Sequence, residues 1–171
     1  MSYNVERRGN QTVIRILFVC TGNTCRSPMA EAILKSKNIS GIEVKSAGVY
    51  AATGVPASQH AQKVLEEQKI DHHHQSSALT RELTDWATFI FTMTTGHKDS
   101  IVRMFPGVKE KVFTLKEFVG HDVDSDIMDP FGGSLEIYRK TYRDIDENIE
   151  KMMEKLSEKF GEEKNGGEEK I

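Results

Sequence analysis

The chain has 171 residues, of which 37% are hydrophobic and 29% are charged, and its formal net charge is -3 at pH 7. This composition is typical of a globular protein, and a slightly acidic chain lacks the basic field that nucleic-acid binding requires. The longest apolar run near the N-terminus, Val13 to Cys20, is interrupted by Arg15 and is far shorter than the roughly 20 residues of a membrane span. We therefore expect a cytoplasmic protein without nucleic-acid or membrane partners. We also expect a monomer.

Polar, non-periodic segments flank one central domain. Residues 1–12 lack the apolar core of a signal peptide, and residues 161–171 are charged and contain glycine, so both are predicted to be disordered. Residues 13–160 then form a single domain of about 150 residues, a size that buries roughly 70% of the unfolded chain's surface and needs no disulfide or metal. The two cysteines, Cys20 and Cys25, are expected to be free thiols in a reducing compartment.

Apolar runs alternate with amphipathic runs along this domain. The segment Val13–Cys20 is largely apolar and β-branched, which is typical of a strand covered on both faces of a parallel sheet. Ser27 and Pro28 then predict a helix start, with the serine hydroxyl as its cap. Further strands are predicted at residues 42–47, 88–94 and 111–115, and further helices at residues 58–69, 95–105 and 134–160.

This alternation predicts an α/β fold, a three-layer sandwich in which a four-stranded parallel sheet has helices on both faces. In such sheets ligands bind where strands end and helices begin. The loop between the first strand and the first helix, "CTGNTCRS" at residues 20–27, is therefore the expected position of a site.

The loop has the features of a phosphate cradle. Backbone N–H groups at a helix start attract anions, and the helix dipole adds to this attraction. Gly22 and Asn23 tolerate left-handed backbone angles that turn successive N–H groups toward one centre, and the Arg26 guanidinium matches two oxygens of a phosphoryl group. Patterns of nucleotide-binding loops are absent, which disfavours nucleoside triphosphate hydrolysis. The residues predicted to bind phosphate are Thr21, Gly22, Asn23, Thr24, Cys25 and Arg26.

Cys20 lies at the base of this loop. A helix N-terminus and a nearby arginine favour the thiolate form, so the field that attracts phosphate also makes a nucleophile. A cysteine that ends a buried strand can instead be a small apolar residue of the core, and the motif C-x5-R-S alone is not specific. Ser27 has two interpretations: its hydroxyl donates to the thiolate, or it only caps the helix.

Transfer of a phosphoryl group to sulfur needs an acid that protonates the departing atom. The segment "DSDIMDPFGGS" at residues 124–134 offers Asp124, Asp126 and Asp129. Asp129 is the preferred candidate, because Pro130 stiffens the turn after it, and Phe131 can form an aromatic wall beside the two following glycines. The alternative is that these aspartates serve only in turns and caps.

Together, "VCTGNTCRSPMAE" and the downstream "DPFGGS" resemble the low-molecular-weight protein tyrosine phosphatases over residues 13–156. The resemblance implies the same four-stranded parallel sheet and no cofactor. It implies that Cys20 forms a cysteinyl phosphate whose oxygens are bound by Arg26 and the loop amides. It further implies that Asp129 protonates the leaving group and then activates water, while Asn23 holds the loop in shape.

Two positions depart from the usual pattern of that family. A bulky aliphatic residue usually stands where this chain has Thr24, and tyrosines usually stand at Phe131 and Gly132. Thr24 with Phe131 resembles the protein arginine phosphatase branch. A small polar residue offers a hydroxyl to a planar guanidine, and Phe131 can pack on the aliphatic stem of arginine. The resemblance to this branch implies hydrolysis of phosphoarginine in proteins, opposition to a protein arginine kinase, and a role in stress response and protein quality control, with phosphotyrosine as the alternative substrate.

Cys25 has two interpretations. It fills space under the loop, or it traps oxidised Cys20 as a disulfide and protects it, and the resemblance favours the second. Rival functions are disfavoured by particular residues. A thioredoxin-coupled arsenate reductase needs two more cysteines, and none follows Cys25. A phosphoryl carrier would not require Asp129, and a non-catalytic phosphate-binding module would need neither a nucleophile nor an acid.

The remaining histidines and Tyr50 are given simple interpretations. Consecutive residues cannot all point at one ion, so the "DHHH" segment at residues 71–74 is predicted to be an exposed loop, and no metal site is expected. His97 is predicted to lie on the surface of its helix. Tyr50 either lines the mouth of the pocket or is an exposed loop residue.

Overall fold

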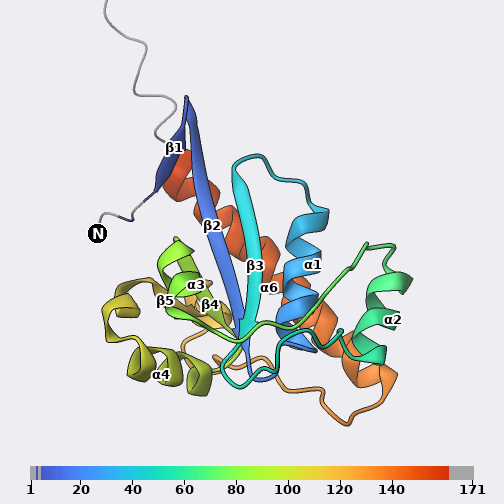
Figure 1. Cartoon of the computed structure of the whole chain (residues 1–171). Coiled ribbons are helices and arrows are strands. Elements are labelled where there is room, and N and C mark those ends of the chain that lie inside the picture. Colours follow the sequence, from blue (N-terminus) through green and yellow to red (C-terminus); the bar gives the residue numbers. More distant parts are fainter. Residues whose placement is uncertain (1–2, 4, 162–171) are drawn as a thin grey trace, which may run out of the picture.

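The computed structural model describes residue 3 and residues 5–161. Parallel strands form the centre of the sheet in the order β3-β2-β4-β5 (Figure 1). They are β2 (Gln11–Cys20), β3 (Ile42–Gly48), β4 (Phe89–Thr92) and β5 (Val112–Thr114). Strand β2 lies between β3 and β4, and its register with β3 places Cys20 opposite Gly48. The prediction of a four-stranded parallel sheet is therefore confirmed.

Side chains of β2 alternate between two apolar layers, because successive residues of a strand point to opposite faces. Ile16 and Phe18 belong to one buried cluster, and Leu17 and Val19 belong to the other. The first cluster includes residues of α1 (Arg26–Ser36), α2 (Gln59–Glu67), α5 (Leu115–Phe118) and α6 (Leu135–Gly161). The second includes residues of α4 (Thr95–Met104) and the 3-10 helix η1 (Pro106–Lys111), with α3 (Arg81–Trp86) packed against it. Helices thus cover both faces, as predicted.

The N-terminal segment differs from its prediction. Strand β1 (Glu6–Arg8) pairs antiparallel with the start of β2, and this hairpin projects at the top of Figure 1. The turn contains Gly9 with a φ of 64°, and Glu6 is paired with Arg15. The prediction of disorder is therefore wrong for residues 6–12, because a short turn and ion pairs hold a strand that has no buried side chain of its own. Residues 1, 2, 4 and 162–171, including nearly all of the predicted tail, lie outside the described residues.

The carboxyl ends of the parallel strands meet at one edge of the sheet, at the bottom of Figure 1. At this edge β2 leads into α1, β3 ends at Gly48, and β4 leads into α4. The edge therefore brings together loops that are far apart in the sequence. Within the described part of the chain, no helix has both the length and the apolar composition needed to cross a membrane.

Candidate active site

The phosphate loop, residues 20–27, connects β2 to α1. Cys20 ends the strand, its side chain is buried, and its Sγ lies 2.9 Å from Ser27 Oγ. Helix α1 begins at Arg26, and no side chain caps it. The capping prediction for Ser27 is therefore wrong, and its hydroxyl instead contacts the sulfur. Among the described residues no group accepts a hydrogen bond from the backbone N–H groups of residues 22–27, so they remain available to an anion.

Asn23 holds the loop from inside. It has a left-handed φ of 56°, and its side chain is fully buried. Its Nδ2 donates to Ser27 Oγ at 2.8 Å and to Ser46 Oγ at 2.9 Å, while Oδ1 accepts from the backbone N–H of Ser77 at 2.9 Å. The amide therefore joins α1, the end of β3 and the segment between α2 and α3. Such a network fixes a backbone conformation that few residues other than glycine and asparagine adopt readily.

Gly48 lets strand β3 approach the loop closely. A Cβ at this position would lie 2.4 Å from the Thr21 carbonyl oxygen and 2.9 Å from the Asn23 backbone nitrogen. These separations are shorter than any van der Waals contact, and the neighbours are backbone atoms that cannot rotate away. A residue with a Cβ therefore does not fit at position 48 without a shift of the phosphate loop.

His74 supports the loop from a third direction. Its Nε2 lies 2.6 Å from the Asn23 carbonyl oxygen, and its Nδ1 lies 3.5 Å from a Glu31 carboxylate oxygen. The prediction of an exposed loop at residues 71–74 is wrong for His74, whose side chain is only 8% exposed. Burial alone would raise the pKa of Glu31, but hydrogen bonds from His74, Lys35 and Ser46 bring that pKa below its usual value. Glu31 is thus a carboxylate that holds His74 in place.

Arg26 links the phosphate loop to the acid loop, which we define as residues 124–134. Its Nη1 donates to the Ile127 carbonyl at 3.0 Å, and its Nη2 lies 3.6 Å from Asp129 Oδ2. The arginine side chain is 5% exposed, whereas the aspartate side chain is 54% exposed. The structure therefore brings Arg26 and Asp129 together, with the carboxylate on the solvent side of the guanidinium.

The other two candidate acids lie elsewhere. Asp126 Oδ1 accepts hydrogen bonds from the backbone N–H of Thr95 at 2.7 Å and from its hydroxyl at 3.1 Å. Asp124 is highly exposed and lies 3.5 Å from Lys116 Nζ. Asp126 thus binds the first residue of α4, and Asp124 forms an exposed ion pair. Asp129 Oδ1 accepts from the Phe131 N–H at 3.1 Å, as a turn aspartate does, while its Oδ2 faces Arg26.

Aromatic side chains stand at the rim of this region. Phe131 is 81% exposed, and Tyr50 is similarly exposed while its backbone N–H donates to the Thr21 carbonyl at 3.0 Å. Thr24 is half-buried, and the Ser58 N–H donates to its carbonyl at 2.8 Å. These side chains are accessible to a substrate from solvent.

A family model described as "Low molecular weight phosphotyrosine protein phosphatase" matches residues 15–162. The chain belongs to this family. It is 61% identical over 125 residues to a protein-arginine-phosphatase of Geobacillus stearothermophilus, covering 73% of this chain and 84% of the relative. It is 46% identical over 134 residues to a protein-arginine-phosphatase of Bacillus subtilis (strain 168), and the match covers 77% of this chain and 89% of the relative. The solved YwlE arginine phosphatase from Geobacillus stearothermophilus has a TM-score of 0.85 at 51% identity, over 92% of this chain and 99% of that one.

Both cysteines of this phosphatase are free and buried. Cys25 Sγ lies 3.3 Å from the Tyr138 hydroxyl and 3.5 Å from Ser58 Oγ. Burial, followed by the contact with Cys25, raises the pKa of Tyr138 to about 12, so the phenol keeps its proton. Cys25 is thus packed under the loop, as the first of its two interpretations expects, while the disulfide remains a prediction.

Sequence reasoning missed His97, which was expected on the surface. His97 is only 7% exposed, and its Nε2 lies 2.8 Å from Thr21 Oγ1. Burial, and then the charge of Arg26, lowers its pKa to about 4, so the imidazole is neutral near pH 7. Only the helix start that precedes it was visible in the sequence, and no pattern indicated that this turn of α4 faces the phosphate loop.

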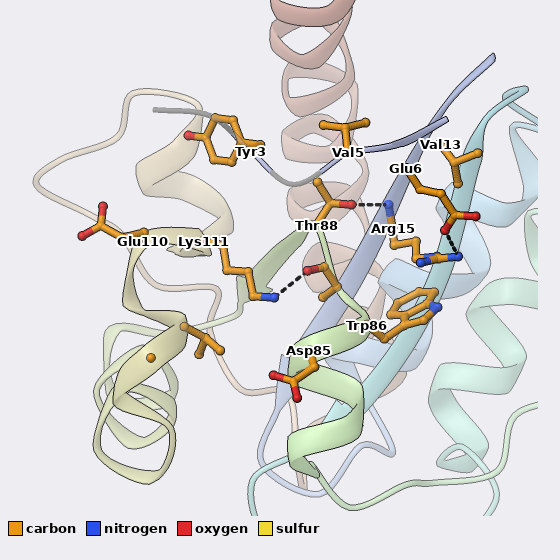
Figure 2. Close-up of a pocket in the computed structure, with 13 residues that line it drawn as sticks. Tyr3, Val5, Glu6, Val13, Arg15, Asp85, Trp86, Thr88, Glu110 and Lys111 are labelled. Atoms are coloured by element: carbon orange, nitrogen blue, oxygen red, sulfur yellow. Dashed lines mark hydrogen bonds and ion pairs between the residues drawn. The ribbon is translucent and has the colours of Figure 1, made fainter. Parts of the chain in front are cut away.

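A hollow of about 510 Å³ lies at the opposite edge of the sheet from the phosphate loop (Figure 2). Val13 and Arg15 at the start of β2 and Thr88 before β4 line it. Its cations are already engaged, because Arg15 pairs with Glu6 and Lys111 Nζ donates to a backbone carbonyl at 2.7 Å. The hollow has no cysteine, so it is not the catalytic site. In the described ranges no group of three or more His, Cys, Asp and Glu side chains is arranged to hold a metal ion.

Proposed function

We propose that this phosphatase hydrolyses phosphoarginine in proteins through a cysteinyl phosphate on Cys20. The observation that carries the proposal is the position of Arg26, whose guanidinium belongs to the phosphate loop and lies 3.6 Å from Asp129. This contact supports the proposal because it joins the loop that carries Cys20 to the segment that carries Asp129. The two relatives named protein-arginine-phosphatases support arginine as the substrate residue.

In the first step, loop N–H groups and Arg26 bind the oxygens of the phosphoryl group. The Cys20 thiolate attacks phosphorus, the P–N bond of phosphoarginine breaks, and protonated Asp129 gives its proton to the departing nitrogen. Ser27 Oγ, 2.9 Å from the sulfur, stabilises the thiolate by donating a hydrogen bond. Preorganised donors of this kind act where charge develops and need no rearrangement.

In the second step, water attacks the cysteinyl phosphate. The Asp129 carboxylate takes a proton from the water, the P–S bond breaks, inorganic phosphate leaves, and the thiolate is restored. The carboxylate that lost its proton in the first step is therefore the base of the second, and the cycle closes without a cofactor.

Thr24 and Phe131, at the rim of the site, are proposed to select the substrate residue. Thr24 offers a hydroxyl to the guanidine of phosphoarginine, and the exposed ring of Phe131 packs on the aliphatic stem. A bulky aliphatic residue at Thr24 would instead favour the apolar ring of phosphotyrosine.

The proposed setting is the cytoplasm, where a monomeric enzyme would remove phosphate that a protein arginine kinase adds to its substrates. Free thiols at Cys20 and Cys25 are compatible with a reducing compartment. We propose that a peroxide oxidises the Cys20 thiolate to a sulfenic acid, and that the Cys25 thiol then attacks its sulfur and releases water, so that a protective disulfide forms, in keeping with a role in stress response.

The test compares two peptides of one sequence that differ only in carrying phosphoarginine or phosphotyrosine. We expect a higher kcat/KM for the phosphoarginine peptide, and Thr24→Ile should shift the ratio toward phosphotyrosine by about tenfold or more, the discrimination that one pocket contact supplies. Thr24→Ser keeps the hydroxyl and should keep the preference. A wild-type enzyme that prefers phosphotyrosine would overturn the assignment of substrate.

A further inference from the structure

The first turn of α4 touches both loops of the active site. From this turn, His97 Nε2 contacts Thr21 Oγ1 in the phosphate loop at 2.8 Å. Thr95, two residues earlier, donates its N–H to Asp126 of the acid loop at 2.7 Å. Thr94 caps the helix by accepting from the His97 N–H at 3.1 Å, so the turn itself is well defined. The first turn of α4 therefore contacts both Thr21, which follows Cys20, and Asp126, which lies three residues before Asp129.

The surroundings of His97 restrict its protonation. The charged groups near the ring are Arg26 from α1 and Asp126 and Asp129 from the acid loop. The Nδ1 atom is buried and has no hydrogen-bond partner among the described residues. In a neutral imidazole one nitrogen is a donor and the other an acceptor. An unpaired buried N–H is rarer than an unpaired acceptor, so the tautomer with its proton on Nε2 is favoured.

We propose, on the basis of the function proposed above, that His97 is a positioning residue for the phosphate loop. Its Nε2–H donates to Thr21 Oγ1, which fixes the side chain next to the nucleophile and leaves the threonine's own hydrogen free to donate to a bound phosphoryl group. The exposed position of Thr21 is consistent with this second hydrogen bond.

Asp126 supplies the complementary half of the arrangement. Its bonds to Thr95 anchor the acid loop to the same helical turn, and the adjacent Ile127 N–H donates to the Met93 carbonyl at 2.7 Å. Asp129 lies shortly after these anchors. Loss of the His97 contact should therefore weaken binding of every phosphoryl group, whereas loss of the Asp126 contact should impair only proton delivery.

The first experiment measures inhibition by inorganic phosphate, with p-nitrophenyl phosphate as the reporter substrate. His97→Phe keeps the ring volume and removes the donor, and Thr21→Val removes the hydroxyl. Each should raise the phosphate inhibition constant by about tenfold, the effect of losing one hydrogen bond in a site, and the double variant should raise it no further. His97→Gln, which can place an N–H near the same point, should recover most of the affinity.

A matched control is His121→Phe, which changes an exposed histidine just before the acid loop and should leave the inhibition constant unchanged. Additive effects of His97→Phe and Thr21→Val would overturn the proposal, as would an unchanged inhibition constant in His97→Phe. If His97→Phe unfolds, His97→Leu, which also lacks the donor, takes its place in the same comparison with Thr21→Val. Because p-nitrophenyl phosphate and inorganic phosphate are used, this outcome does not depend on whether the natural substrate is phosphoarginine.

The second experiment separates the two loops. Asp126→Ala should lower kcat on a phosphoarginine peptide by about tenfold and leave the phosphate inhibition constant within twofold of wild type. Asp124→Ala, in the same loop but paired with Lys116, should change neither quantity. An Asp126→Ala enzyme that loses phosphate affinity, or keeps full turnover, would contradict separate anchoring by the turn.

Discussion

The phosphate loop and the acid loop differ in how firmly the fold holds them. Asn23, Gly48 and His74 fix the phosphate loop by buried hydrogen bonds and close backbone packing. The acid loop is anchored at Asp126 and Ile127, but its tip is open, with Phe131 81% exposed. Groups that stabilise charge act best when preorganised, whereas a proton donor beside a leaving group must allow substrate entry. The firmly held phosphate loop suits charge stabilisation, and the open tip of the acid loop suits substrate entry.

Removal of the nucleophile should have the largest effect. Cys20→Ser keeps the loop and its amides but replaces the thiolate with a poorly ionised hydroxyl, so turnover should fall by at least about 10,000-fold while inorganic phosphate still binds. Steady-state rates and phosphate protection against thermal unfolding measure the two quantities. Turnover above one-thousandth of wild type would show that the sulfur is not the nucleophile.

Removal of the acid should have the next largest effect, and the effect should depend on the leaving group. Asp129→Asn should lower kcat on phosphoarginine by roughly 100 to 10,000-fold, because the departing nitrogen needs a proton. It should affect formation of the cysteinyl phosphate from p-nitrophenyl phosphate far less, which a burst measurement of nitrophenolate detects. Asp124→Asn is the control. Equal losses of burst rate on both substrates would point to damage of the phosphate loop, and full turnover in Asp129→Asn would show that Asp129 is not the acid.

Crowding the phosphate loop should also be severe. Gly48→Ala places a Cβ 2.4 Å from the Thr21 carbonyl oxygen, so the loop must shift. We expect the free energy of unfolding to fall by about 2 kcal/mol and kcat/KM to fall by about 100-fold. Gly107→Ala meets open space at an ordinary backbone angle and should change neither. An active, stable Gly48→Ala enzyme would mean that the loop is less constrained than the contacts indicate.

The sequence predicted the parts of this site that follow from local chemistry. Strand β2, the loop around Cys20 and the choice of Asp129 could be read from an apolar run, glycine and asparagine, and a proline turn. His74 and His97 could not, because their importance comes from where the fold places them relative to the loop. Strand β1 was missed for a similar reason: its side chains are exposed, and only pairing with β2 gives it structure.

The smallest predicted effect concerns His97 and pH. Its pKa is about 4 in the folded protein and 6.5 in the unfolded chain, so the unfolded state binds more protons between these values. The neutral form contributes stability above pH 6.5, and this contribution is lost as pH falls toward 4. Such a shift corresponds to at most about 3 kcal/mol, which solvent screening reduces to about 2 kcal/mol. Because carboxylates such as Glu31 also lose stabilisation in acid, denaturant unfolding at pH 7 and 4.5 should show a loss that is larger in wild type than in His97→Gln by this amount. Identical losses would contradict the buried neutral imidazole.

The most direct test of the mechanism is to trap the intermediate. Wild-type enzyme would be mixed with a phosphoarginine peptide, and Asp129→Asn with p-nitrophenyl phosphate, whose leaving group needs no acid. Both would be quenched within milliseconds and digested for mass spectrometry under conditions that preserve thiophosphate. We predict a phosphoryl group on Cys20 in both enzymes. Asp129→Asn should release it far more slowly, because no carboxylate is present to take a proton from the attacking water. A phosphoryl group on another residue, or rapid hydrolysis by a Cys20→Ala enzyme, would contradict the account.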